Sequence, residues 1–194
     1  MSSMYSIERC RNCPNSIIDL DAVEKLVKEV FESTAFNQKQ KTRLQTDRPM
    51  HHQIFRVAIA GCPNSCSQPQ IKDFGIQGQL VPSLAEGCTL CGECARSCPD
   101  QAIELMESGP EINRGLCLNC GVCVRKCPVG ALRSQKSGYR LLAGGKLGRR
   151  PRLATVGIEL ADEDSLKKYL SETLSLLINR GNPGERLGQL LDRI

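Results

Sequence analysis

The chain has 194 residues, of which 40% are hydrophobic, 24% are charged and 4% are aromatic, with a formal net charge of +5 at pH 7. This composition excludes a disordered or fibrous chain and is typical of one or two small domains with apolar cores. The longest mostly apolar run, IFRVAIAG, is far shorter than the roughly 20 residues that a transmembrane helix needs. The first ten residues, MSSMYSIERC, lack a basic region followed by an apolar one. We therefore expect no membrane span and a cytoplasmic location.

The first third of the chain predicts a helix followed by strands. Residues 19–32, DLDAVEKLVKEVFE, carry apolar side chains at helical spacing, and Asp21 with Glu24 is the predicted N-terminal capping pair. The polar segment 33–53 predicts a partly helical surface connection, in which His51 and His52 are loop residues. The β-branched segment 54–61 predicts a buried strand, and residues 71–77 predict a second, short strand.

The last third of the chain resumes the same α/β pattern after a cysteine-rich block. Residues 138–161 contain two strand-like runs around a turn rich in glycine and arginine. Residues 162–181 have the apolar spacing of a long helix, and a short amphipathic tail follows. We therefore predict an α+β fold in which residues 1–83 and 137–194 form one unit and residues 84–136 form an inserted domain.

The inserted block is an internal repeat of four cysteines. The spacing C-x2-C-x2-C-x3-C-P begins at Cys88 and recurs unchanged 29 residues later, at Cys117. Three cysteines at intervals of three wrap one face of a four-iron cluster, whereas the fourth is expected to start a short helix and to ligate the cluster of the other repeat. Gly92 and Gly121 are expected to let backbone amides approach the cluster. The first predicted ligand set is Cys88, Cys91, Cys94 and Cys127, and the second is Cys98, Cys117, Cys120 and Cys123.

This block resembles the bacterial two-cluster ferredoxins at every ligand position. The alternative is structural zinc, which also uses paired cysteines but seldom a third cysteine at the same interval. The ferredoxin resemblance covers about fifty residues and implies a module with two [4Fe-4S] clusters that transfers single electrons.

Four of the twelve cysteines remain, namely Cys10, Cys13, Cys62 and Cys66. This is the number that one further cluster needs, and a chain without an export signal uses such cysteines for metal or cluster ligation more often than for disulfides. We predict a third [4Fe-4S] cluster at these four residues. Structural zinc and unrelated buried thiols stay open as alternatives.

The segments around these four cysteines resemble the siroheme-dependent sulfite and nitrite reductases. FRVAIAGCPNSCSQPQIKDFGI resembles the second cysteine pair of that family, and CPNSIIDLDAVEKLVKEVF resembles the segment after its first pair. LLAGGKLGRRPRLA and PGERLGQLL resemble the end of the dissimilatory sulfite reductase subunits, which also carry an inserted ferredoxin module. The first pair departs from the family spacing C-x5-C, because Ile7 stands where the first ligand is expected.

The reductase resemblance implies specific roles for several residues. Cys66 would bridge the third cluster to a siroheme iron, and Lys146, Arg149 and Arg150 would pair with siroheme carboxylates. The family's long N-terminal region, which binds siroheme and the substrate anion, has no counterpart in the nine residues before Cys10.

The resulting function is iron-sulfur redox chemistry. The first hypothesis is a reductase-like protein that passes electrons from the ferredoxin module to the third cluster, coupled to siroheme for reduction of sulfite or nitrite. The alternative is a non-catalytic electron carrier or a subunit of a larger oxidoreductase. The expected partners are a redox protein, a small oxyanion if the chain is catalytic, and a second subunit or second copy. A zinc-stabilised nucleic-acid-binding module is disfavoured because basic and aromatic residues are not interleaved.

Overall fold

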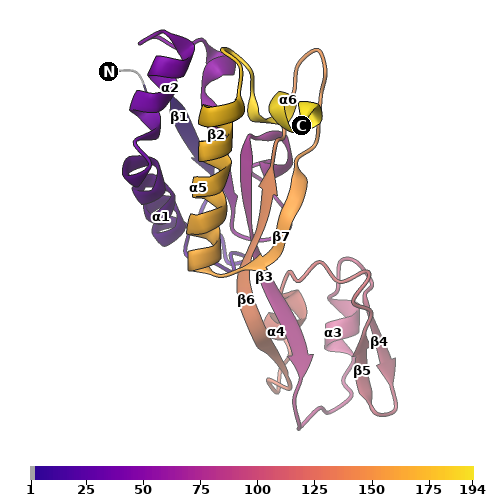
Figure 1. Ribbon diagram of the computed structural model, residues 1–194. Coiled ribbons are helices and arrows are strands. Elements are labelled where there is room, and N and C mark those ends of the chain that lie inside the picture. The colour runs from indigo at the N-terminus through magenta and orange to yellow at the C-terminus, as the bar shows by residue number, and fades with distance from the viewer. Residues whose placement is uncertain (1–2) are drawn as a thin grey trace.

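The structure is a computed structural model that describes residues 3–194. Seven strands form a five-stranded sheet in the order β1-β2-β3-β6-β7 and a separate two-stranded hairpin, β4-β5 (Figure 1). The strands are β1 (Tyr5–Arg9), β2 (Phe55–Ala60), β3 (Phe74–Leu84), β4 (Ile103–Met106), β5 (Gly109–Ile112), β6 (Leu132–Ala143) and β7 (Thr155–Ala161). The helices are α1 (Leu20–Ser33), α2 (Phe36–Leu44), α3 (Glu93–Arg96), α4 (Val122–Lys126), α5 (Glu163–Arg180) and α6 (Leu187–Arg193), with short 3-10 turns at His51–Gln53 and Pro69–Ile71.

The large sheet is mixed in direction. β1, β2 and β3 are parallel neighbours, and β6 and β7 continue the sheet in antiparallel pairing. α1 and α2 connect β1 to β2, as expected of a parallel crossover. The connection between β2 and β3 contains only a single 3-10 turn, and this is the segment that carries Cys62 and Cys66.

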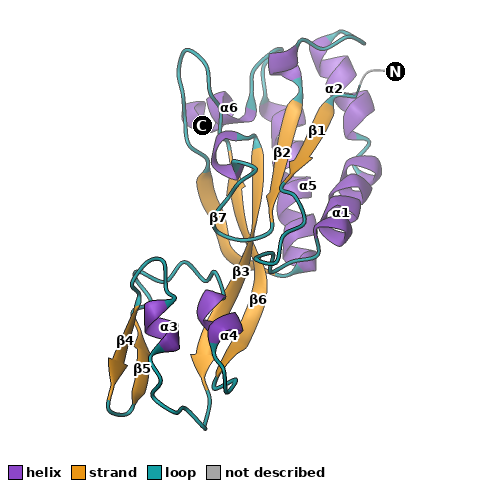
Figure 2. Cartoon of the chain, turned by 180° about the vertical axis from the view of Figure 1, so that it is seen from behind, coloured by secondary structure: helices purple, strands orange, loops and turns teal. Residues whose placement is uncertain are grey.

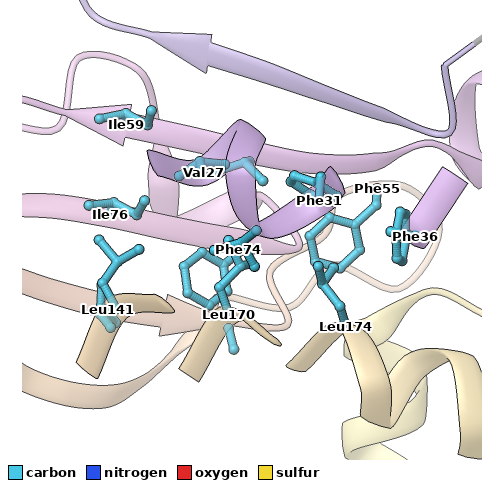
Figure 3. Packing of buried hydrophobic residues seen from close by; sticks show 14 of the residues in the cluster. Val27, Phe31, Phe36, Phe55, Ile59, Phe74, Ile76, Leu141, Leu170 and Leu174 are labelled. Carbon is cyan, nitrogen blue, oxygen red and sulfur yellow. The ribbon is translucent and has the colours of Figure 1, made fainter. Parts of the chain in front are cut away.

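Helices cover one face of the large sheet. The main core lies between these helices and the sheet. Phe31 of α1 packs against Phe36 and Phe55, with ring centroids 5.3 Å and 6.0 Å away. Phe74 of β3 is completely buried, and the side chains from the sheet and from α5 meet around it (Figure 3). Because apolar residues alternate along β3 while they follow helical spacing on α1 and α5, the sequence itself selects this face for the core.

The start of α1 corrects one expectation. Asp19 is the N-cap, and its carboxylate accepts hydrogen bonds from the backbone N–H groups of Asp21 and Ala22 at 2.9 Å and 3.0 Å. The predicted capping pair was wrong, because Asp21 and Glu24 instead form ion pairs with Arg9 of β1 at 2.7 Å and 3.0 Å. These pairs attach the first turn of α1 to the end of β1.

The cysteine-rich block forms a smaller lobe at the far end of β3 and β6, and the two views show these strands running from the large sheet into it (Figure 1, Figure 2). α3, α4 and the β4-β5 hairpin complete this lobe. The expectation that the fourth cysteine of each repeat starts a helix was wrong. α3 and α4 each contain the third cysteine, Cys94 or Cys123, and end before or at the fourth.

The predicted elements 19–32, 54–61 and 162–181 correspond to α1, β2 and α5. The segment 33–53 contains α2, and the strand predicted at 71–77 starts later and extends to Leu84. Neither β1 nor the β4-β5 hairpin was predicted. No helix between residues 3 and 194 has the length and apolar character needed to cross a bilayer.

Candidate iron-sulfur site

The pair Cys10 and Cys13 is brought next to the pair Cys62 and Cys66 by the parallel pairing of β1 with β2. The last residue of β1, Arg9, lies opposite Ile59, and the N–H of Cys10 then donates to the Ile59 carbonyl at 3.0 Å. The Gly61 N–H donates to Cys10 Sγ at 3.1 Å, so this sulfur lies beside the residue that precedes Cys62. The carboxyl ends of two adjacent parallel strands thus place both pairs at one edge, where such sheets commonly bind ligands.

The thiols of this first group, which we call the neck set (Cys10, Cys13, Cys62 and Cys66), influence one another. Burial raises the pKa of the Cys62 thiol, and the neighbouring thiols of Cys13, Cys10 and Cys66 raise it further. Cys66 is exposed, and its sulfur accepts a hydrogen bond from Asn64 Nδ2 at 3.2 Å. The group therefore combines the partly buried thiol of Cys62 with the exposed thiol of Cys66.

The turn between Cys62 and Cys66 is held against β3. Ser65 has a left-handed backbone, with a φ of 58°, and it is buried. Its hydroxyl accepts a hydrogen bond from Gln77 Nε2 at 2.5 Å and donates to the Pro63 carbonyl at 3.0 Å. These contacts fix the turn on the sheet face opposite to the helices.

The eight cysteines of the repeat line two cavities in the smaller lobe. The wall of one cavity contains the distal set, namely Cys88, Cys91, Cys94 and Cys127. The wall of the other contains the middle set, namely Cys98, Cys117, Cys120 and Cys123. Each cavity therefore receives three cysteines from one repeat and the fourth from the other.

The two sets of the smaller lobe share their local chemistry. Burial raises the pKa of the Cys94 thiol and raises that of Cys123 to about 11, and adjacent thiols add to both shifts. The fourth cysteine of each repeat is different, because its sulfur accepts a backbone N–H: Cys98 from Ala102 at 3.3 Å and Cys127 from Leu132 at 3.5 Å. The Leu132 hydrogen bond lowers the pKa of Cys127.

These donor sets fit an iron-sulfur cluster chemically. Four cysteines line each of the two cavities of the smaller lobe, and thiolates are the ligands that such clusters use. Buried thiols with raised pKa values stay protonated without a cation, so metal binding must release their protons. Between residues 3 and 194, no group of three or more His, Cys, Asp or Glu side chains has the arrangement of a single-ion site.

The middle set lies toward the neck set, and β3 joins them. A Cβ on Gly78 would lie 2.4 Å from the Gly61 carbonyl oxygen, next to Cys62. Two residues farther along β3, the Leu80 N–H donates to the Asn119 carbonyl at 2.7 Å, and Leu80 forms an isolated bridge with Cys120. At the usual rise per residue of a strand, Leu80 lies about 7 Å along β3 from Gly78. Leu84, which lines the distal cavity, lies about 13 Å beyond Leu80.

The basic candidates lie on the loop between β6 and β7. Lys146 is only 7% exposed, and its ammonium group donates to the Arg150 carbonyl at 2.5 Å, so it supports the loop itself. Arg149 and Arg150 are exposed on the same loop. His51 lies in a 3-10 turn against Arg56 Nη2, and His52 is exposed.

The family comparison identifies the chain. The family model described as the nitrite and sulphite reductase 4Fe-4S domain matches residues 6–194. The chain belongs to this family. This membership supports at least one iron-sulfur cluster and an iron-sulfur redox function, and it confirms the sulfite/nitrite reductase resemblance of the sequence.

Three proteins illustrate what this reductase-family chain is similar to. It is 34% identical over 164 residues to the coenzyme F420-dependent sulfite reductase of Methanocaldococcus jannaschii, a match that covers 84% of this chain and 24% of that protein. The chain therefore spans about a quarter of that relative. The crystal structure of dissimilatory sulfite reductase I aligns with a TM-score of 0.63 and 17% identity, over 97% of this chain and 49% of the other. NirA of Mycobacterium tuberculosis aligns with a TM-score of 0.56 and 19% identity, over 100% and 26%. These structures show a mixed α/β fold of the same type.

Sequence reasoning missed the polar residues that support the sets of this reductase-family domain. Gln77 and Gln79 are buried on β3, and Gln77 contacts Ser65 in the turn of the neck set. Their signal was available, because glutamine in the interior of the run FGIQGQL is unusual for a strand that is buried on both faces. Asn15 was also missed, and its side-chain oxygen lies 3.5 Å from Arg125 Nη2 of α4.

Proposed function

We propose that this chain is the electron-transfer part of a sulfite or nitrite reductase system, with a ferredoxin-type insertion. The distal, middle and neck sets would each hold one [4Fe-4S] cluster, and the clusters supply one-electron transfer when bound. The observation that carries the proposal is the placement of three four-thiol sets in succession along β3. Electrons would enter at the distal set and leave at the neck set.

The middle set is the natural intermediate because it makes contact with the neck region. Arg125 of α4 reaches Asn15, which lies two residues after Cys13, and Leu80 of β3 reaches Cys120. Both contacts connect elements of the smaller lobe with elements that frame the neck set. An electron transferred from the distal to the neck set would therefore pass the middle set.

Siroheme coupling is the finer part of the proposal. Cys66 suits the bridging role, because its sulfur is exposed while Cys62 is partly buried. The basic loop supports siroheme less well, since Lys146 already donates to the Arg150 carbonyl and leaves Arg149 and Arg150 as the exposed cations. This internal use of Lys146 favours the second candidate function, a non-catalytic electron carrier or subunit.

The proposed electron-transfer function implies partners that supply electrons and that complete a substrate site. The name of the archaeal relative includes dependence on coenzyme F420, which supports a separate electron source for this chain as well. A redox protein would deliver electrons to the smaller lobe. A second subunit or second copy would complete the substrate site, and sulfite or nitrite would be the substrate if siroheme binds.

The deciding experiment measures iron, labile sulfide and the anaerobic optical spectrum of the chain made in a siroheme-producing host. We expect about twelve irons from three clusters, and about eight in each of the single variants Cys62→Ser and Cys120→Ser. A tetrapyrrole band would favour the reductase function. About twelve irons without that band would favour the electron carrier. If the wild-type chain contained about eight irons and Cys62→Ser contained the same number, a third cluster would be contradicted.

A further inference from the structure

Two buried glutamines on β3 lack partners for most of their polar atoms. Gln77 is 4% exposed and Gln79 is 0% exposed. Gln77 Oε1, Gln79 Oε1 and Gln79 Nε2 are the buried side-chain atoms that have no hydrogen-bond partner within the described part of the chain. A buried amide without a partner loses its hydrogen bonds to water and gains none in the protein. Native proteins therefore seldom retain such amides unless a ligand or cofactor binds there.

The side chains of both glutamines lie on the face of β3 that contacts Ser65, in the turn between Cys62 and Cys66. Side chains alternate along a strand, and Phe74 and Ile76 occupy the face that packs against the helices (Figure 3). Gln77 and Gln79 therefore lie on the opposite face. Gln77 confirms this direction, because its Nε2 donates to Ser65, which lies between Cys62 and Cys66.

Gln79 occupies the step of β3 between the neck set and the middle set. On one side, Gly78 packs against Gly61, which precedes Cys62. On the other side, Leu80 pairs with Cys120. The Gln79 amide is therefore the buried, unpartnered polar group that lies nearest along the strand to the proposed passage of electrons.

We propose that Gln79 is a positioning residue whose amide N–H donates a hydrogen bond to a sulfur atom of the cluster bound by the neck set. This inference rests on the proposed function. A cluster with four thiolates offers acceptors and no donors, so the amide nitrogen is the orphaned atom that it can satisfy. The two amide oxygens need donors, which an ordered water in the same polar site would supply.

Such a bond would set the direction of electron flow. A hydrogen bond to cluster sulfur stabilises the more negative, reduced form and so raises the reduction potential. Raising the potential at the neck set favours transfer from the middle set toward it. Gln79 would thus make the exposed end of the relay, at Cys66, the electron acceptor.

The test is a potentiometric titration of the anaerobically loaded full chain, followed by electron paramagnetic resonance. Gln79→Met keeps the length of the side chain and removes the N–H donor. We expect the potential of the neck-set cluster to become more negative while about twelve irons remain. The matched control is Gln40→Met, because Gln40 is 1% exposed in α2 but accepts a hydrogen bond from Arg43 Nε at 2.9 Å, remote from the cysteine sets.

A second readout uses the chain without clusters. Because Gln79 then buries an unpartnered amide, Gln79→Met should raise the urea midpoint of the cluster-free chain, whereas Gln40→Met should lower it. Should the methionine variant load incompletely, Gln79→Leu provides the same loss of the donor. An unchanged potential with full iron content in the Gln79 variant, or an equal shift in the Gln40 control, would overturn the role of Gln79 and leave the proposed function intact. A wild-type chain with about eight irons would overturn the third cluster, and the Gln79 inference with it.

Discussion

At the residue scale, Gly78 of β3 packs closely against Gly61, the residue before Cys62. A Cβ on Gly78 would lie 2.4 Å from the Gly61 carbonyl oxygen, so Gly78→Ala must push the end of β2 away from β3. Overpacking of this kind costs about 1–3 kcal/mol of unfolding free energy. We expect a lower urea midpoint and loss of iron from the neck set, with the two sets of the smaller lobe still loaded.

The matched control for this change is Gly115→Ala in an exposed turn, where the nearest atom, Asn113 Oδ1, lies 3.3 Å away and belongs to a side chain. Iron per chain and anaerobic urea denaturation measure both variants. Full iron content and an unchanged midpoint in Gly78→Ala would contradict the role of this contact.

Residue spacing explains which parts of the site could be predicted. The two groupings within the repeat follow from short local intervals, whereas the neck set was predicted by counting the four remaining cysteines and from the reductase resemblance. Asp19 and Gln79 could not be assigned in the same way. The N-cap depends on where the chain leaves its extended conformation, and this point lies at Asp19, two residues before the predicted Asp21. The missing partners of Gln79 become visible only when the chain covers both faces of β3.

At the element scale, α6 is attached to the large sheet by a buried ion pair. Arg186, the N-cap of α6, donates to Asp73 through Nε at 3.2 Å and through Nη2 at 2.8 Å, and the Asp73 side chain is only 2% exposed. The Arg56 backbone N–H also donates to Asp73 at 3.0 Å. Removing Arg186 would leave a buried carboxylate with one partner fewer, so Arg186→Met should cost about 3–5 kcal/mol of unfolding free energy at neutral pH.

The same variant should show a defined pH dependence. Burial raises the pKa of Asp73, whereas Arg186 opposes that rise. Without Arg186, the folded-state pKa moves higher above the unfolded value, and stability is lost as the pH rises through the folded-state pKa. The deficit relative to wild type should therefore be larger at pH 8 than at pH 5 in urea denaturation. Arg193→Met, which removes the partly exposed pair between Arg193 of α6 and Glu185, should show no such change with pH, and an equal deficit of Arg186→Met at both pH values would contradict the explanation.

The elements themselves differ in how well the sequence indicates them. Long amphipathic patterns such as α1 and α5 are unambiguous because several turns repeat the same face. β1, by contrast, is a five-residue strand with only partly buried side chains, so its sequence YSIER contains too few alternations to distinguish it from a loop. Its pairing with β2 decides the geometry of the neck set, and long-range pairing of this kind has no local signal.

At the scale of the whole molecule, the smaller lobe is electrostatically divided. Residues 84–116 contain six acidic and two basic side chains, whereas residues 117–136 contain four basic and no acidic ones. Exposed Leu105 and Met106 lie among the acidic residues of the β4-β5 hairpin. This division places an acidic surface with apolar side chains beside the distal cavity, which Leu105 also lines, and it predicts that cationic electron donors approach there.

The methyl viologen radical cation provides a direct test of this charge division, with anionic dithionite as the reductant of opposite charge. In the loaded chain, the double variant Glu104→Lys with Glu107→Lys should slow reduction by the viologen on the order of tenfold at low salt and should speed reduction by dithionite. The difference should shrink as the ionic strength rises, because salt screens exposed charges beyond about 10 Å at 0.1 M. The matched variant Arg133→Glu with Lys136→Glu changes the same number of charges on the basic segment. This matched variant makes the chain more negative. If it speeded viologen reduction as strongly as the hairpin variant slowed it, entry at the distal set would be contradicted, because steering would then follow net charge and not the acidic hairpin.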